Sequence, residues 1–593
     1  MSFRRRVSTD LGTVILHWVL VAFFSAAAAS GLRIASDDPG LRWLSLLDAI
    51  LPANGLWLTH MVAAVGLIAA LIAYAVYMVR SRLVPRVSLG AAQFANLLVR
   101  GRMRWAAAGK IAYWLFVPAM VLEIITGFVL FLGFGGASLD LHVLGAWICL
   151  AFPLVHIACH WAYGRSQQLL RVLRPARLVV PAPQPDFAQL LAVEIGKSSA
   201  KRGGSRRQSL AHEPTSEKRR PLIWSLAAAV VVAIALVAVE PLTRQTLTVI
   251  RIAPSAAPRL NGDLSDPAWA YAPVVSVLTE HGANFGGTGE SLVEVRAVHD
   301  GTNIYFAFTW TDPTRSLKHL PLVKRNDGWH LAETAYDHAE EETFFEDKFA
   351  VLVTRPALPL IGAGIHLAVR PLVGLPGGWT GRGLHYLANG GLANVWQWHS
   401  DHDDIIDDGA FTAPEPASPE QIAGLERYNG GYTAERGPAR YMDNFEKPPA
   451  DLSRQIVLPR RLPKDASALS MHLGWISGNP DLSESESAHW WMTLEDSVPY
   501  SPAADRKIPL NTVIPGVVVL KSGTRPSRIV GAARWSAGRW TLTLARRMKP
   551  AGTSDVPMES GTMLWVAAFD HSQTRHTRHL RPITLEIADA DPT

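Results

Sequence analysis

The chain has 593 residues, several times the size of a typical domain, so at least two folded units are expected. Hydrophobic residues make up 48% of it and charged residues only 18%, which excludes an intrinsically disordered protein and indicates insertion into a membrane. Its two cysteines, Cys149 and Cys159, exclude a disulfide framework, a Cys-x-x-Cys-His haem attachment, a cysteine-ligated iron–sulfur cluster and a four-cysteine zinc site.

Charge is distributed unevenly along the chain. Residues 1–240 contain 24 Lys and Arg against 11 Asp and Glu, whereas residues 241–593 contain 33 against 40. The basic residues of the first part lie between apolar runs of about 20 residues. This is the pattern of loops on the inner face of a membrane, not of a surface that binds phosphates, so no nucleic-acid partner is expected.

Five apolar segments are each long enough to cross a lipid bilayer, which takes about 20 mostly apolar residues. They are predicted at Thr13–Ile34, Leu56–Val79, Ile111–Gly133, Leu141–Tyr163 and Leu222–Val239.

The basic loops all fall on one side of these five spans. Arg4, Arg5 and Arg6 precede the first span, and the loops after the second and fourth spans are also basic. We therefore expect a multi-pass protein of the bacterial inner membrane with a cytoplasmic N-terminus, a basic cytoplasmic linker over 176–220 and a periplasmic C-terminal domain.

Four histidines lie at matched depths in the predicted spans. His17 is near the inner end of the first span and His60 near the outer end of the second, while His142 and His156 are near the outer and inner ends of the fourth. Fourteen residues of helix correspond to about 21 Å of rise and bring His142 and His156 to nearly the same face. Ionisable residues at this depth are costly and usually functional. The expected pairs are His60 with His142 and His17 with His156.

Two histidines at each depth favour axial ligation of haem b, because neutral imidazole binds iron and the porphyrin packs between apolar helices. Zinc fits poorly, since two histidines leave half of its tetrahedral shell empty. The alternative is that these histidines are buried polar residues or interface anchors, which suits a single histidine better than four matched ones. His160 lies one turn beyond His156 on the same face, so geometry leaves the choice of inner ligand open.

Short motifs of the first 175 residues support the two pairs: Leu16-His17-Trp18, Ser30-Gly31-Leu32, Thr126-Gly127-Phe128, Leu141-His142 and Val155-His156-Ile157. They resemble the di-haem cytochrome b family that includes the b-type subunits of nickel-iron hydrogenases and formate dehydrogenases. The resemblance implies a four-helix membrane core over 1–175 with two haems b and His156 as the last ligand. It also implies a quinone site near one haem, although no short motif assigns its residues.

Two further charged residues lie in or near the predicted spans. Glu123 is in the middle of the third span, where it is expected as a neutral carboxyl group hydrogen-bonded to a neighbouring helix, or as a group that helps a proton follow an electron. Arg33 is near the outer end of the first span, where it pairs with a haem propionate or extends to the lipid headgroups.

Residues 250–593 have a different sequence pattern, in which short runs of alternating apolar and polar residues are bounded by Gly, Pro, Asn and Asp. One hairpin is predicted over 293–310 around Asp300-Gly301 and a second over 532–544, and several such hairpins indicate a β-sandwich with long insertions. No nucleophile elbow, phosphate loop, dinucleotide fingerprint or His-Glu-x-x-His motif occurs there. The acidic run 401–408 is expected as a solvated loop, with a calcium site as the alternative.

This region also contains a set of weak motifs in a characteristic order: Leu260 to Trp269, Thr309-Trp310-Thr311-Asp312, Phe345-Glu346-Asp347-Lys348, Asn394 to Trp398 and Arg534 to Leu544. They resemble the haem-binding domain of the ethylbenzene dehydrogenase γ-subunit family. The resemblance implies a β-sandwich that binds one haem b, often through Met and Lys, and passes electrons for molybdenum enzymes. Here the late segment offers histidines in place of Lys, so His385 and His579 are the predicted ligands of a third haem, and loss of that haem is the alternative.

Together these patterns predict an α-helical membrane bundle, with a four-helix di-haem core and a fifth transmembrane helix over 221–240, followed by an all-β sandwich. The expected function is electron transfer across the membrane between the quinone pool or a redox-enzyme partner and a periplasmic haem domain. The partner would be a periplasmic redox protein or a molybdoenzyme or hydrogenase-type subunit, and the protein itself an electron-transfer subunit, not an independent catalyst. The alternative is a membrane-anchored sandwich that binds or senses a ligand, with a structural or redox-sensing cytochrome b core.

Overall fold

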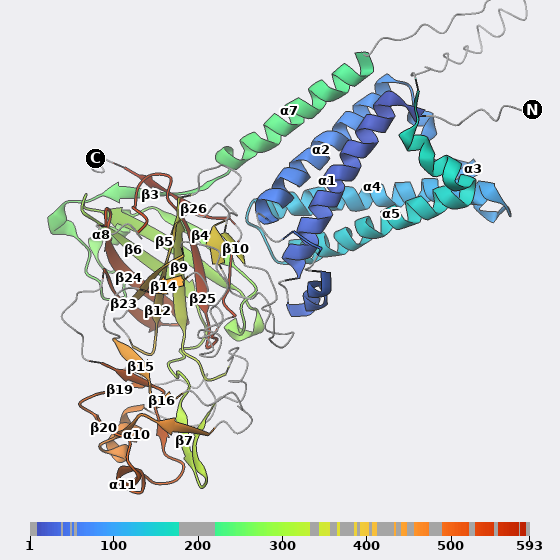
Figure 1. The fold of residues 1–593 in the computed structure, drawn as a ribbon. Coiled ribbons are helices and arrows are strands. Elements are labelled where there is room, and N and C mark those ends of the chain that lie inside the picture. The colour runs from blue at the N-terminus through green and yellow to red at the C-terminus, as the bar shows by residue number, and fades with distance from the viewer. Residues whose placement is uncertain are drawn as a thin grey trace, which may run out of the picture. The chain divides into compact units, whose positions relative to one another are not determined.

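The structure is a computed structural model, in which the chain forms two compact units, one of membrane-type helices and one rich in β-strands (Figure 1). It describes residues 9–36, 39–47, 50–52, 56–176, 220–332, 343–355, 365–367, 385–387, 392–402, 406–411, 432–434, 440–446, 456–473, 489–520, 528–550, 555–573, 575–579 and 581–588.

Among the described residues, five helices are long and apolar enough to cross a membrane, as the sequence predicts. They are α1 (Leu11–Ala35), α2 (Leu56–Arg80), α4 (Arg102–Phe131), α5 (Ala137–Leu169) and α7 (Arg220–Leu242). Shorter helical segments connect them: η1 (Pro39–Leu47), η2 (Val84–Arg86), α3 (Ala91–Leu98) and η3 (Leu170–Leu173). The two-residue strands β1 (Thr9–Asp10) and β2 (Pro175–Ala176) pair in parallel. Most of the predicted linker over 176–220 lies outside the described residues.

Small apolar contacts hold the helices together. Ala119 and Met120 of α4 and Cys149 of α5 are buried in one cluster, and Phe24 of α1 and Leu67 of α2 pack against it. This cluster joins four helices into one bundle, which agrees with the predicted four-helix core.

The fifth long helix packs on a second cluster. Leu222 and Ala229 of α7 contact the buried residues shared by α1 and α2, among them Leu16 and Tyr77. The outward faces of the helices are apolar, as at Leu154, which is 72% exposed. Such surface is stable only against lipid, so these helices form an integral membrane domain.

The β-rich unit contains most of the strands. Its main sheet uses β3 (Gln245–Arg251), β4 (Val274–Thr279), β5 (Ser291–His299), β6 (Asn303–Thr311), β9 (Lys348–Thr354), β12 (Ala393–His399), β13 (Ile406–Phe411), β14 (Tyr432–Ala434), β23 (Ile529–Ser536), β24 (Arg539–Arg547), β25 (Met563–Phe569) and β26 (Ile583–Ile587). Their order is β14-β13-β12-β9-β25-β26-β3-β5-β6-β24-β23, with β4 paired to β5, and the sheet curves into a near-barrel sandwich (Figure 1). The predicted hairpins are confirmed as the antiparallel pairs β5–β6 and β23–β24.

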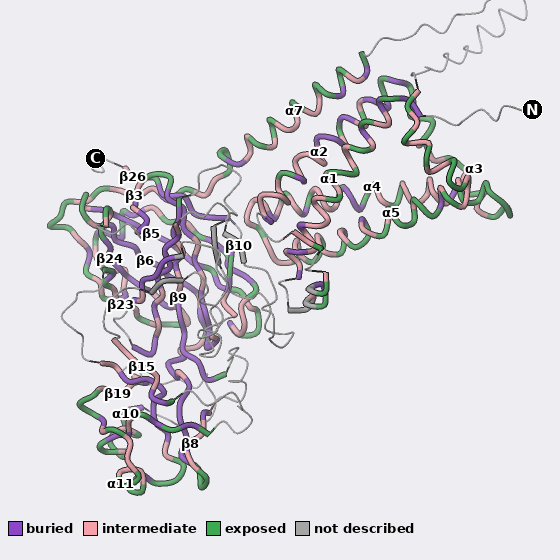
Figure 2. Tube along the Cα trace, in the orientation of Figure 1, coloured by how far each residue is buried: buried purple, intermediate pink, exposed green. Residues whose placement is uncertain are grey.

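Aromatic side chains fill the centre of this sandwich, where Figure 2 shows the strands as mostly buried. Trp310 of β6 is fully buried, and its ring centroid lies 4.4 Å from that of Phe349 on β9 and 5.8 Å from that of Trp398 on β12. Trp540 of β24 completes the group at 4.8 Å from Trp398. Large buried rings fix the ends of four strands, so the residues that follow Trp398 leave the core at a defined position.

A second, smaller β-lobe was not predicted. It consists of β7 (Leu322–Arg325), β8 (Gly328–Leu331), β15 (Tyr441–Asp443), β16 (Phe445–Glu446), β17 (Ile456–Pro459), β18 (Arg461–Pro463), β19 (Trp491–Thr493), β20 (Ser497–Pro499), β21 (Val513–Ile514) and β22 (Val517–Val519). It has its own core around Leu322, Trp329 and Phe445. The described part of the β-rich unit also contains the short helices α8 (Pro267–Tyr271), α10 (Ala466–Leu473) and α11 (Pro502–Asp505) and the antiparallel pair β10 (Ile365–Leu367) and β11 (His385–Leu387).

Candidate functional site

The predicted outer pair is brought together in the helical bundle. His60 of α2 and His142 of α5 face each other with ring centroids 6.4 Å apart and ring planes at 79°. Two metal–imidazole bonds of about 2 Å each, with the short distance from each nitrogen to its ring centre, give a centroid separation of about 6 Å. The observed spacing therefore fits one metal ion held axially between these two rings.

Hydrogen bonds fix which nitrogen of each ring carries the proton. The Nδ1 atom of His60 lies 3.1 Å from the carbonyl oxygen of Ala27, which can only accept a hydrogen bond. The Nδ1 atom of His142 lies 2.9 Å from the hydroxyl of Thr126, whose own proton is donated to the carbonyl of Leu122. Both rings therefore carry their proton on Nδ1, which leaves the Nε2 lone pair free to bind a metal.

The same local device occurs twice in the bundle. Ser30 on α1 contacts Nδ1 of His60 at 3.2 Å, and Thr126 on α4 plays this part for His142. Each hydroxyl residue is followed by a glycine, and a Cβ atom on Gly31 or Gly127 would lie 3.1 Å from Cε1 of the neighbouring histidine ring. The Ser-Gly and Thr-Gly motifs thus have one physical purpose: the hydroxyl orients the ring and the glycine leaves space for it.

The predicted inner group, His17, His156 and His160, is arranged differently from the outer pair. His156 and His160 of α5 have ring centroids 4.5 Å apart, and His17 of α1 interacts electrostatically with both. The Nδ1 atom of His160 lies 3.3 Å from Nε2 of Gln168, whereas the buried Nδ1 of His156 has no partner among the described residues. A metal-ligating histidine usually donates its second ring N–H, whereas Nδ1 of His160 accepts from the Gln168 amide. The contact therefore does not single out His160, and His156 and His160 both stay candidates for the inner ligand.

The two charged residues near the spans have defined surroundings. Glu123 places Oε2 3.2 Å from Nδ1 of His142, against the side of the ring that faces away from the gap. Its Oε1 is buried beside Gly145, where a Cβ atom would lie only 2.3 Å away. Arg33 is buried and donates a hydrogen bond to Ser36 at 2.7 Å, so it does not extend to the lipid headgroups in this arrangement.

Of the two predicted ligands of the β-rich unit, only His579 has a described side chain. His579 is buried, with Nδ1 2.6 Å from the carbonyl of Arg581 and Nε2 accepting a hydrogen bond from the backbone N–H of Val566 at 3.0 Å. Burial lowers the pKa of His579 to about 4, so the ring is neutral. It would have to give up one of these contacts to bind iron. His385 belongs to β11, but its side chain lies outside the described residues.

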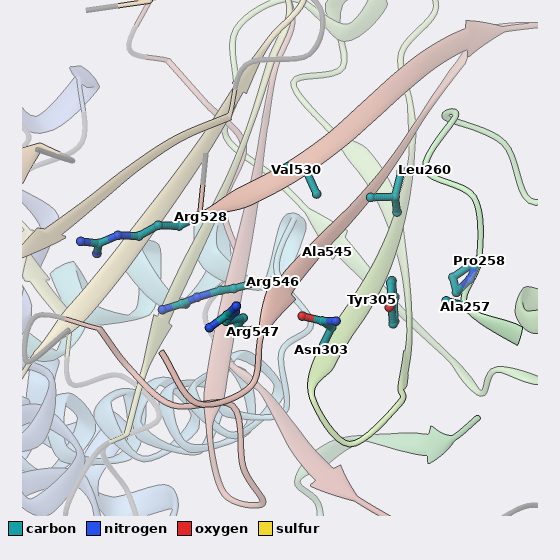
Figure 3. Close-up of a pocket in the computed structure, with 10 residues that line it drawn as sticks. All are labelled: Ala257, Pro258, Leu260, Asn303, Tyr305, Arg528, Val530, Ala545, Arg546 and Arg547. Atoms are coloured by element: carbon teal, nitrogen blue, oxygen red, sulfur yellow. The ribbon is translucent and has the colours of Figure 1, made fainter. Parts of the chain in front are cut away.

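One pocket of the β-rich unit has a cavity of about 440 Å³ between the segment around Pro258 and strand β24. Figure 3 shows Arg528, Arg546 and Arg547 on one side of it and Tyr305 with Pro258 on the other. Arg528 pairs with Asp555 at 2.9 Å, and Arg546 lies 3.6 Å from the same carboxylate. Two of the three arginine charges are therefore already paired within the protein.

Comparison with known proteins accounts for both units. A family model described as prokaryotic cytochrome b561 matches residues 8–174, and a family model described as ethylbenzene dehydrogenase matches residues 266–581, more than half of the chain. The chain belongs to the ethylbenzene dehydrogenase family. Its N-terminal part is a cytochrome b561 domain, so the predicted fusion is confirmed.

Other comparisons are distant. No curated protein matches the chain. Among solved structures it is similar to a candidate carbohydrate-binding protein of Bacteroides uniformis, with 8% identity, a TM-score of 0.23 and coverage of 58% of this chain and 99% of that one. It is also similar to a family 9 carbohydrate-binding module of Caldicellulosiruptor kristjanssonii in complex with glucose, with 6% identity, a TM-score of 0.19 and coverage of 58% and 98%.

The cytochrome b561 assignment agrees with the geometry of the helices. This family binds b-type haem, usually two, and carries electrons in membranes. His60 and His142, whose Nδ1 atoms are hydrogen-bonded within the bundle, would hold one such haem through their Nε2 atoms.

Sequence reasoning missed one group of residues in the ethylbenzene dehydrogenase family domain. The acidic run 401–408 is not a solvated loop where it is described, because Asp401 is 1% exposed, His402 3% and Asp408 3%. The His-x-x-His spacing of His399 and His402 was the available signal, but the residues that join them in space, His319 and Glu346, are distant in sequence.

Proposed function

We propose that this membrane-bound b-type cytochrome carries electrons across the bacterial inner membrane, between the quinone pool or a redox-enzyme partner on one side and its C-terminal domain on the other. The observation that carries the proposal is the His60 and His142 pair, with its 6.4 Å centroid spacing and its anchored Nδ1 atoms. Haem b bound there would supply reversible one-electron chemistry.

The chain's own residues do three things in this proposal. Ser30 and Thr126 hold each imidazole in the tautomer that presents Nε2, and Gly31 and Gly127 keep the rings close to the neighbouring helices. The apolar helices exclude water from the site. His17, with His156 or His160, would form the second site about 21 Å further along α5, so that the two sites together reach most of the way across a bilayer.

The proposed orientation places the C-terminal domain in the periplasm. The stretch from the end of α2 to the first turns of α4 carries seven basic residues: Arg80, Arg82, Arg86, Arg100, Arg102, Arg104 and Lys110. Basic loops stay in the cytoplasm, and an odd number of spans then carries the C-terminal domain outside. A periplasmic redox protein, or a molybdoenzyme or hydrogenase-type subunit, would exchange electrons with that domain.

Two experiments test this proposal. First, a water-soluble quinol added to membranes that contain the full-length protein should reduce its b haems, and a His142→Ala variant should lose part of the reducible absorbance. Second, a reporter enzyme active only in the periplasm should be active when fused after Thr593 and silent when fused near Ser205. Failure of the quinol to reduce any b haem would refute the quinone link, and two silent fusions would refute the orientation.

The second candidate function is a membrane-anchored module that binds or senses a ligand, with the cytochrome core structural or redox-sensing. It is favoured by the contacts of His579, which occupy both ring nitrogens of a predicted haem ligand. A pyridine haemochrome assay of the full-length protein separates the two: three haems per polypeptide support a haem in the C-terminal domain, whereas two support a domain without one.

A further inference from the structure

A group of histidine and carboxylate side chains lies at the end of strand β12, outside the haem sites described above. The strand ends at His399, directly after the buried Trp398 of the aromatic core. Ser400 then donates its backbone N–H to the carbonyl of Asp347 at 2.9 Å and its hydroxyl to the carbonyl of Ser316 at 2.7 Å. These bonds hold the segment from His399 to His402 on a rigid part of the sandwich.

Three residues of this segment form a compact triad. His399, Asp401 and His402 each offer one nitrogen or oxygen atom, and these atoms lie within 4.8 Å of one another. The two imidazole rings have centroids 5.0 Å apart and are nearly parallel, at 27°. Asp401 also forms an ion pair with His402 through Oδ1 and Nδ1. Two histidines and one carboxylate at this spacing are a common donor set for a divalent metal.

Two of these atoms are buried without a hydrogen-bond partner among the described residues. The Nε2 atom of His402 is one of them, although the side chain is only 1% exposed, whereas its Nδ1 faces Oδ1 of Asp401. The Nε2 atom of His399 is the other. Folded proteins leave few buried polar groups unpaired, and each one calls for an explanation. One metal ion bound to the triad would satisfy these atoms together.

A second carboxylate, that of Glu346, orients His399 of the triad. Glu346 is fully buried and lies 2.7 Å from Nδ1 of His399 through Oε1 and 2.7 Å from Nδ1 of His319 through Oε2. A carboxylate on Nδ1 presents Nε2 outward, which is the usual support of a metal-binding histidine.

We propose that His399, Asp401 and His402 bind one divalent transition-metal ion, such as zinc or iron(II), with Glu346 orienting His399. Imidazole ligands suit these metals. Calcium, the ion considered for the acidic run, requires six to eight oxygen ligands and fits this nitrogen-rich group poorly. Three protein ligands leave further coordination positions for water or a small ligand, so the site has the form of a reactive centre or sensor in the C-terminal domain.

The proposal is tested on the full-length protein, purified in detergent, stripped with a chelator and then supplied with zinc or cobalt(II). Elemental analysis should find about one metal ion per polypeptide beyond haem iron, and cobalt should give the visible absorption of a site with nitrogen ligands. His402→Gln should weaken zinc binding by at least about tenfold, and Glu346→Gln should weaken it about tenfold by removing the support of His399. The matched control is His330→Gln, which changes another histidine paired with a carboxylate, at 2.8 Å from Asp327, and should leave zinc binding unchanged.

Two results would overturn the proposal. One is wild-type protein that binds neither zinc nor cobalt after stripping, a measurement that depends on no variant. The other is equal zinc affinity in wild type and in His402→Gln. The membrane haems provide a separate readout: their spectrum should be the same in all these variants, so a failure of the metal site is distinguishable from a failure of the proposed electron transfer.

Discussion

The histidines of the membrane helices and those of the β-rich unit form their sites in different ways. In the helices, the position of a histidine within an apolar run gives its depth, and the helical repeat gives its face, so His60 and His142 could be paired from the sequence alone. In the β-rich unit, His399 reaches Glu346 because strand β12 pairs with β9, with His399 opposite Lys348. Strand pairing between distant segments cannot be deduced from spacing, so sites that depend on it are hidden from the sequence.

The largest expected effect concerns the outer of the two histidine pairs in the membrane helices, His60 and His142. His142→Ala removes one of two facing ligands and leaves the inner histidines intact, so the full-length protein should lose one b haem and keep the other. Pyridine haemochrome analysis per polypeptide measures this directly. The matched variant is the analogous change in the β-rich unit, His579→Ala, which should leave both membrane haems in place. Two haems at full occupancy in His142→Ala would show that the pairing is wrong.

At the inner site, the same kind of experiment tests whether His156 or His160 is the haem ligand. His156→Ala should abolish the inner haem, and His160→Ala should leave it bound with at most a shifted midpoint potential, if the resemblance that assigns His156 is correct. The Gln168 amide donates to Nδ1 of His160, so this contact does not favour His160 over His156. Redox titration of the two variants decides between them, because retention of the inner haem in His156→Ala together with its loss in His160→Ala would make His160 the ligand.

A smaller effect is expected from the groups that orient the outer ligands. Thr126→Val keeps the shape of the side chain but removes the hydroxyl at 2.9 Å from Nδ1 of His142. Outer-shell contacts of this kind are worth about 10–100-fold in metal affinity, so the outer haem should bind more weakly or shift its potential. Ser30→Ala should have an effect of similar size, because each ring keeps one other contact at Nδ1: the Ala27 carbonyl at 3.1 Å for His60 and the Glu123 carboxyl group at 3.2 Å for His142. Identical outer-haem potentials in wild type and Thr126→Val would contradict this role.

The smallest expected effect is a pH dependence of the β-rich unit. Burial, followed by the charges of Asp347 and Asp570, holds the pKa of Asp312 well above its usual value. The folded protein therefore keeps a proton that the unfolded chain releases above about pH 4. This proton stabilises the fold fully at lower pH, and its contribution is lost as the pH rises toward the raised pKa.

Asp312→Asn is neutral at every pH and should flatten this dependence. The free energy of unfolding of the full-length protein, measured by thermal unfolding between pH 5 and pH 8, should fall less steeply with pH in the variant, by on the order of 1 kcal/mol per pH unit. The exposed carboxylate of Asp327 supplies the control, since Asp327→Asn should leave the slope between these pH values unchanged. Parallel curves for wild type and Asp312→Asn would contradict the raised pKa.

Much of the membrane half was predictable because hydropathy and the helical repeat act locally. The predicted span Leu56–Val79 is nearly identical to α2, which ends at Arg80. The span predicted from Ile111 begins earlier in the structure, at Arg102, because a helix continues through polar residues once its backbone hydrogen bonds have formed. Hydropathy marks only the part of a helix that lies in lipid.

The β-rich half was predictable in class but not in detail. The two hairpins around Gly301 and Gly538 have local turn signals, and the structure confirms them. The smaller lobe consists of strands of two to four residues, such as β7 and β21, which are too short to show a period of two. The burial of Asp401 and His402 likewise follows from the position at which Trp398 enters the core, which only the fold reveals.

The central claim is that electrons cross the membrane through this protein, and proteoliposomes test it most directly. Full-length protein would be reconstituted into liposomes with ferricyanide trapped inside, and a membrane-impermeant reductant would be added outside. The account predicts that the wild type reduces the trapped ferricyanide, while His142→Ala liposomes do so no faster than protein-free liposomes. Equal rates for wild type and His142→Ala, or a wild-type rate no higher than that of protein-free liposomes, would contradict it.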